Sequence, residues 1–264
     1  MRTSDGTYLA VVEFGGEGTP ILLLHGLMGR ASTWWSLARG LTAHGRVLGL
    51  DARGHGRSQA TGPWTVERMA RDAAEVLEPL GPGLVVGHSM GGLHALALAA
   101  TRPDLVSGLV VLDMGADLTG LPPGTMADAE VWFGAVPQPF PSRAAVVEAF
   151  GHPRRELGEY MAECVDERAD GFHLLTRVRD AAEIAGEWVR RDFWAEVDGV
   201  RCPALFVEAE ESVVPSGQMA EMAARTPRGR HVRPAGTGHL VHADETAFLD
   251  LVTPFLADVI ADAP

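Results

Sequence analysis

Short apolar runs alternate along this chain with stretches in which apolar residues recur at helical spacing. A run that is apolar at every position is typical of a strand buried on both faces. Strands that alternate with helices pair in parallel through crossovers. The pattern therefore predicts an α/β fold with a mostly parallel sheet and helices on both faces. The strands are expected near residues 20–26, 46–51, 83–86, 108–113, 203–208 and 231–233, with an antiparallel edge strand at 7–13.

The alternation stops between residues 116 and 197. This region has prolines at 122, 123, 137, 139 and 141 and shows no buried strand. Helical stretches are expected at 142–150, 154–167 and 174–189. An excursion that leaves the carboxyl end of a strand is typical of a helical lid over a site. We therefore expect a core of residues 1–115 and 198–264 and a helical cap of residues 116–197.

Length and charge narrow the class of protein. A chain of 264 residues suits one large domain, and its net charge of −13 disfavours contact with nucleic acid or an anionic membrane surface. The start of the chain lacks a signal-like apolar stretch, and no run is long enough to span a membrane, so we expect a cytoplasmic protein. The two cysteines lie far apart and indicate no zinc site or disulfide framework. The sequence leaves a homo-oligomer open.

The candidate nucleophile lies in the stretch Gly87-His88-Ser89-Met90-Gly91, between an apolar run and a helical one. A G-x-S-x-G pattern at a strand-to-helix turn presents its serine at a sharp, strained bend. The N-terminus of the following helix would face an oxyanion formed there. We therefore predict that Ser89 is a nucleophile.

A serine hydroxyl needs a base within hydrogen-bond reach. Of the 10 histidines, His239 follows Gly236-Thr237-Gly238 directly after the last expected strand, which makes it the predicted base. His242 is expected in a packing role nearby. The histidines beside turns, namely His25, His55 and His88, are expected to make structural hydrogen bonds.

These motifs, in this order, resemble the α/β-hydrolase superfamily. They are His25-Gly26 after a buried strand, the loop at 51–58, the Ser89 turn and the Gly-Thr-Gly-His239 loop. The resemblance covers nearly the whole chain except the lid and points to the serine-nucleophile, esterase-like branch with a helical cap. It implies an oxyanion hole made by the backbone N–H groups of Leu27 and Met90.

The same resemblance leaves the acidic member of the triad open. Similar hydrolases commonly carry an aspartate four residues before a proline in the loop after the penultimate strand, and counting back from Pro215 gives Glu211. We favour Glu211, with its neighbours Glu208 and Glu210 as further candidates. Asp113 is the alternative, because it ends the strand after the nucleophile helix. Geometry decides triad membership.

The implied chemistry is cleavage of small to medium apolar carboxylic esters through an acyl-enzyme. No metal or organic cofactor is expected, since the chain lacks H-E-x-x-H, P-loop and G-x-G-x-x-G motifs. Candidate substrate-binding residues are Met28, His88, Trp132 and Trp188.

Other functions use the same residues. A carbon–carbon bond hydrolase, a lactonase, a thioesterase and a cofactor-free perhydrolase would share this triad. A non-catalytic ligand receptor on the same fold is an alternative of another class. Serine at the turn, where haloalkane dehalogenases and epoxide hydrolases place aspartate, argues against those two activities.

Overall fold

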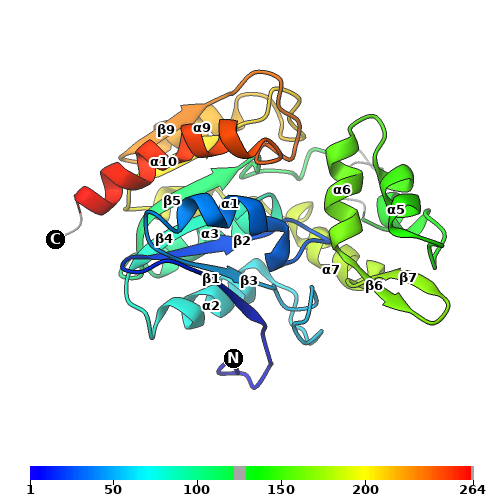
Figure 1. Ribbon diagram of the computed structural model, residues 1–264. Helices are drawn as coiled ribbons and strands as arrows, with labels where there is room; N and C mark the ends of the chain where they lie inside the picture. The colour runs from blue at the N-terminus through cyan, green and yellow to red at the C-terminus, as the bar shows by residue number, and fades with distance from the viewer. Residues whose placement is uncertain (122–128, 263–264) are drawn as a thin grey trace.

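A seven-stranded sheet forms the centre of the molecule, as Figure 1 shows for the computed structural model, which describes residues 1–121 and 129–262. The strand order is β1-β3-β2-β4-β5-β8-β9. Only β1 runs antiparallel, against β3, and every other neighbouring pair is parallel. The predicted α/β fold class is confirmed. The strands are β1 (Val11–Gly15), β2 (Pro20–Leu24), β3 (Arg46–Leu50), β4 (Gly83–His88), β5 (Val106–Leu112), β8 (Ala204–Val207) and β9 (Gly229–Val232).

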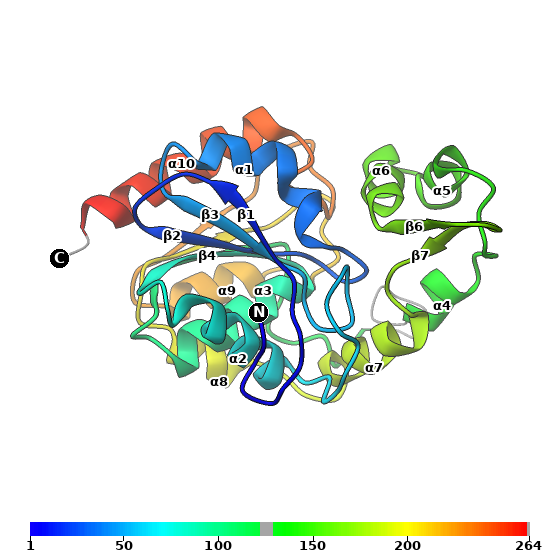
Figure 2. The same ribbon diagram turned by 60° about the horizontal axis from the view of Figure 1, so that its bottom comes forward.

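Helices cover both faces of this sheet (Figure 2). One face carries the 3-10 turn η1 (Ala31–Trp34), α1 (Trp35–Leu41) and α10 (Glu245–Ala261). The other carries α2 (Val66–Leu77), α3 (Met90–Thr101), α8 (Trp194–Gly199) and α9 (Gln218–Arg225).

The apolar runs become central strands because neighbouring side chains point to opposite faces. Ile21 and Leu23 of β2 pack against the α1 and α10 layer, whereas Leu22 and Leu24 pack against the α2 and α3 layer. All four side chains are almost completely buried. Two apolar cores, one on each side, therefore fix the register of the strands.

The segment between β5 and β8 holds α4 (Ala129–Gly134), α5 (Arg143–Phe150), α6 (Arg155–Glu163), β6 (Val165–Arg168), β7 (Gly171–Leu174) and α7 (Val178–Trp188). Figure 1 shows α5, α6 and the hairpin beyond one end of the sheet. We call residues 116–197 the inserted segment. Pro122 and Pro123 lie outside the described residues.

The expectation of a purely helical insertion is wrong. The helix expected over 154–167 ends at Glu163, and β6 and β7 form an antiparallel hairpin around a turn at 169–170. The next helix begins at Val178 rather than near 174 because β7 extends to Leu174. The division into a core and a cap stays a prediction, and its boundary at 197 falls inside α8, which packs against α3.

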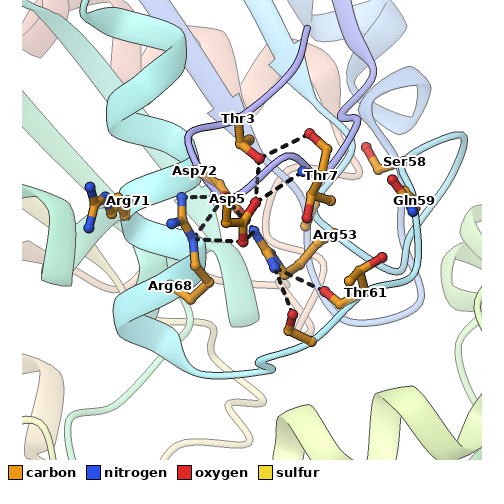
Figure 3. Close-up of polar contacts among 12 residues, drawn as sticks. Thr3, Asp5, Thr7, Arg53, Ser58, Gln59, Thr61, Arg68, Arg71 and Asp72 are labelled. Carbon is orange, nitrogen blue, oxygen red and sulfur yellow. Dashed lines mark hydrogen bonds and ion pairs between the residues drawn. The ribbon is translucent and has the colours of Figure 1, made fainter.

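A buried ionic network ties the N-terminal segment to α2 (Figure 3). The fully buried guanidinium of Arg53 donates to Asp72 at 2.6 Å and to Asp5 at 3.0 Å. Arg68 donates to the same Asp72 at 2.7 Å, and Arg53 also reaches the backbone carbonyl of Thr61 at 2.9 Å. The network anchors the loop at 51–58.

Within the described part of the chain, no helix is both long enough and apolar enough to cross a membrane.

Candidate active site

The turn that carries Ser89 has the strained geometry that its motif predicts. Ser89 has a φ of 50° and a ψ of −119°, between the end of β4 and the start of α3. A Cβ atom at Gly87 would lie 2.2 Å from the carbonyl oxygen of Gly91, and one at Gly91 would lie 2.3 Å from that of Leu24. Only glycine fits at either position. The Ser89 hydroxyl makes no hydrogen bond with any residue that the structure describes, so it is available to a base.

His239 and Asp113 form the central polar contact of the site. Nδ1 of His239, in the loop after β9, lies 2.7 Å from Oδ2 of Asp113. Asp113 directly follows β5, has a φ of 46° and is completely buried. Because its carboxylate accepts the Nδ1 proton, the other ring nitrogen, Nε2, is left as the acceptor.

The second oxygen of Asp113 is held by the loop that follows β8. Oδ1 accepts hydrogen bonds from the N–H of Ala209 at 2.9 Å and from the hydroxyl of Ser212 at 2.6 Å. Strands β5 and β8 are neighbours in the sheet, which brings their following loops together. These donors satisfy a carboxylate that is shielded from water.

Glu211, our favoured acid, does not contact His239. Its side chain is 69% exposed, and its carboxylate lies 2.7 Å from Nη2 of Arg154 in the inserted segment. The backbone of Glu211 bonds to Thr237, so the residue is close to the His239 loop but its carboxylate points elsewhere. The structure corrects the acid assignment and brings the alternative, Asp113, to His239.

The other glutamates of this loop are engaged elsewhere as well. Glu208 is buried and lies 2.8 Å from Nε2 of His231. Glu210 accepts a hydrogen bond from the N–H of Gly236 at 2.6 Å. Neither side chain is bonded to His239 among the described contacts.

The two expected oxyanion donors come from different segments, since Leu27 follows β2 and Met90 begins α3 directly after Ser89. Neither the N–H of Leu27 nor that of Met90 has a hydrogen-bond acceptor among the residues that the structure describes. Met28 follows Leu27 with a φ of 64° and is buried, and it is not among the described residues that line the cavity. Substrate contact by Met28 is therefore not supported.

Buried histidines near the site make the structural contacts that we expect of them. His88 donates from Nε2 to the carbonyl of His239 at 3.0 Å, and burial holds the pKa of His88 well below its ordinary value. His242 stacks on the Trp34 ring with centroids 4.5 Å apart, and burial together with nearby His239 lowers the pKa of His242 to about 3. His55 bonds to the Arg53 carbonyl at 3.1 Å. The expected packing and structural roles of these residues are confirmed.

An apolar cavity of about 390 Å³ adjoins Ser89 and His239. The lining of this cavity includes three of the expected substrate-binding residues, His88, Trp132 and Trp188. Sequence reasoning missed several lining residues. The α6 residues could have been found from their helical spacing, whereas those in irregular loops carry no local signal. The lining residues that were missed are Met114, Leu118, Leu157, Tyr160, Val213, Val214 and Leu240.

In the described part of the chain, no group of three or more His, Cys, Asp or Glu residues is placed to hold a metal ion. The expectation that no metal or cofactor is needed stays a prediction.

The model of the alpha/beta hydrolase fold family matches residues 19–246. The chain belongs to the α/β-hydrolase family. Among its relatives is the mouse (Mus musculus) sn-1-specific diacylglycerol lipase ABHD11, 30% identical over 90% of this chain and 80% of that protein. Esterase Rv0045c of Mycobacterium tuberculosis is also 30% identical, over 92% of this chain and 85% of the esterase.

Solved structures agree with this membership. E-2-(acetamidomethylene)succinate hydrolase has a TM-score of 0.84 and 25% identity, and the match covers 95% of this α/β-hydrolase and 96% of that chain.

The zebrafish (Danio rerio) ABHD11 aligns over only 45% of the present chain and 39% of its own length, at 41% identity. Because relatives that align with this chain over at least 80% of their own length are named an esterase and a lipase, this α/β-hydrolase is an enzyme of the hydrolase class.

Proposed function

We propose that this α/β-hydrolase is a serine carboxylesterase that cleaves small to medium apolar esters through an acyl-enzyme. The observation that carries the proposal is the 2.7 Å contact between His239 and the buried Asp113, because His239 lines the same cavity as the strained Ser89. Nucleophile, base and acid are the three roles that such a reaction requires.

In the proposed reaction, Nε2 of His239 takes the hydroxyl proton of Ser89 as its oxygen attacks the ester carbonyl. The N–H groups of Leu27 and Met90 stabilise the oxyanion of the tetrahedral intermediate. One such donor typically contributes about 3 kcal/mol of transition-state stabilisation. His239 then protonates the leaving alcohol, and an acyl-enzyme forms. Throughout, the carboxylate of Asp113 stabilises the positively charged imidazolium.

The second half of the reaction repeats these steps with water. His239 takes a proton from a water molecule, which attacks the acyl carbonyl and regenerates the oxyanion. Collapse of this intermediate releases the carboxylic acid and returns the proton to Ser89. The same two N–H groups serve both intermediates.

The cavity supports an apolar, uncharged substrate. Apart from Ser89, His88 and His239, its described lining is apolar or aromatic, and burial keeps His88 neutral. A volume of about 390 Å³ lies toward the small end of ligand pockets, which span roughly 300–1,000 Å³. An anionic substrate would lose its hydration there, and no lysine or arginine is among the described residues that line the cavity.

Hydrolysis of p-nitrophenyl acetate, butyrate and octanoate by wild type and Ser89→Ala tests the proposal, together with labelling of both proteins by a fluorophosphonate. We expect wild type to turn over at least one ester and to be labelled, and Ser89→Ala to do neither. A labelled wild type without ester turnover would instead favour carbon–carbon, lactone or thioester cleavage. A wild type that is neither labelled nor active would favour a ligand receptor.

A further inference from the structure

The carbonyl oxygen of Gly26 collects three hydrogen-bond donors. His25 Nδ1 lies 2.8 Å from it, the N–H of Gly29 lies 3.0 Å from it, and the hydroxyl of Tyr160 lies 3.4 Å from it. Nε2 of His25 accepts from the N–H of Ala52 at 3.0 Å, so the His25 proton is on Nδ1 and Nδ1 is the donor. Such convergence on one carbonyl oxygen fixes the orientation of its peptide plane.

That peptide plane carries the Leu27 N–H. In a planar trans peptide the C=O of one residue and the N–H of the next point in opposite directions. Donors that hold the Gly26 oxygen on one side therefore direct the Leu27 N–H to the other side. Gly26 and Leu27 both line the cavity that contains Ser89. The orientation of this single peptide thus decides whether the Leu27 N–H faces a bound oxyanion.

Tyr160 is the donor that comes from the inserted segment. It lies on α6 and itself lines the cavity. A Cβ atom at Gly29 would lie 1.8 Å from the Tyr160 hydroxyl and 2.8 Å from the Gly26 oxygen, so the hydroxyl occupies space that only a glycine leaves free. Burial raises the pKa of Tyr160 well above its ordinary value, which keeps the hydroxyl protonated as a donor.

We propose that Tyr160 is a positioning residue, which aligns the Leu27 N–H for the oxyanion by bonding the Gly26 carbonyl. The inference rests on the proposed esterase function. The inserted segment then has a part in catalysis as well as in enclosing substrate. Because His25 and Gly29 also bond the Gly26 oxygen, removal of the Tyr160 hydroxyl weakens the alignment without abolishing it.

Tyr160→Phe tests the proposal, since it keeps the ring and its packing and removes only the hydroxyl. Leu157→Ala is the matched control, because Leu157 lies on the same helix and lines the same cavity without a polar side-chain atom. The measurements are kcat and KM for p-nitrophenyl butyrate and the inhibition constant of an alkyl trifluoromethyl ketone, which forms a tetrahedral adduct with an active serine. Ser89→Ala is assayed alongside.

For Tyr160→Phe we expect kcat to fall about 2- to 10-fold, the range that loss of one hydrogen bond produces, with KM within about twofold of wild type. The inhibition constant of the ketone should rise by the same factor as kcat falls. In Leu157→Ala, KM and the inhibition constant should move together. If Tyr160→Phe does not fold, Gly29→Ala must show the kcat loss, because its methyl group presses on both the hydroxyl and the Gly26 oxygen.

Two results would overturn the inference while leaving the esterase intact. One is Ser89-dependent turnover with an unchanged kcat in Tyr160→Phe. The other is a Tyr160→Phe variant that behaves like Leu157→Ala, which would make Tyr160 a packing contact only. Ester turnover that survives in Ser89→Ala would refute the proposed function itself, and this inference with it.

Discussion

Replacing Asp113 by asparagine keeps the shape of the side chain and removes its charge. Asp113 Oδ1 accepts from the Ala209 N–H and the Ser212 hydroxyl, and Oδ2 accepts from His239. An asparagine offers one oxygen in place of two. Its oxygen is expected to remain with the two donors of the β8 loop, because an NH₂ group there would face the backbone N–H of Ala209 in a buried position.

That orientation puts the asparagine NH₂ against His239. Nδ1 of His239 must then accept a hydrogen bond, so the ring proton moves to Nε2 and the histidine can no longer take a proton from Ser89. The same tautomer error in a serine protease reduces kcat about 10⁴-fold. For Asp113→Asn we expect a loss of about 10³- to 10⁴-fold in kcat, or about 4–5 kcal/mol in the activation free energy.

Glu211→Gln is the matched control, because it is the same chemical change in the neighbouring loop. The Glu211 carboxylate is mostly exposed and pairs with Arg154, so its loss should change kcat less than about threefold. Both variants would be assayed on p-nitrophenyl butyrate after thermal unfolding has shown that each is folded at the assay temperature. A Glu211→Gln variant that loses activity by orders of magnitude, beside a nearly normal Asp113→Asn, would refute the reasoning.

Three further predictions concern the cavity, the ionic network and the buried histidines. Leu118→Ala should enlarge the cavity and raise kcat/KM for p-nitrophenyl octanoate relative to acetate by about tenfold; an unchanged ratio would exclude Leu118 from the acyl site. Asp72→Asn should lower the free energy of unfolding in urea by about 3 kcal/mol, because it removes a negative charge that pairs with the buried Arg53. Asp104→Asn is the control, since Asp104 forms an exposed ion pair with Arg102, and it should cost less than about 1 kcal/mol. Burial lowers the pKa of His94 in the folded protein to about 3. Between about pH 3 and about pH 6.5, His94 therefore binds a proton in the unfolded chain but not in the folded one, so the free energy of unfolding falls as the pH falls. When the pH is lowered from 6.5 to 5, the free energy of unfolding of His94→Leu should therefore fall less than that of wild type, by up to about 1.4 kcal/mol per pH unit. Urea unfolding at several pH values measures this, and the same pH dependence in both proteins would show that His94 is not its cause.

The strained turn at Ser89 could be predicted from the sequence because much of its geometry is set by contacts within a few residues. The close approach of Gly87 to Gly91 is a local steric requirement, and a local motif records it. His239 could be predicted for a related reason, since a loop after a parallel strand lies at the carboxyl edge of the sheet. The fold class followed from apolar periodicity, which central strands require.

The hairpin in the inserted segment was missed although it has a sequence signal. The turn itself is Ala169-Asp170, and Gly171 begins β7 directly after it. An aspartate and a glycine at this point are the kind of turn residues that signal a hairpin. Gly171 has a φ of 134°, which disfavours any other residue there. The helical reading failed because β6 exposes its last three side chains, so no alternation of buried and exposed positions marks it as a strand.

The acid could not be assigned from spacing because two adjacent strands end beside the same histidine. β5 and β8 are hydrogen-bonded neighbours, so a carboxylate in the loop after either strand can come near His239. Counting to a proline selects the loop after β8 but says nothing of where a side chain points. In this chain that loop contributes donors, since Ala209 and Ser212 bond the carboxylate that extends from β5. With those donors present and Glu211 paired to Arg154, a second carboxylate at His239 would be both unsupported by hydrogen bonds and repelled by Asp113.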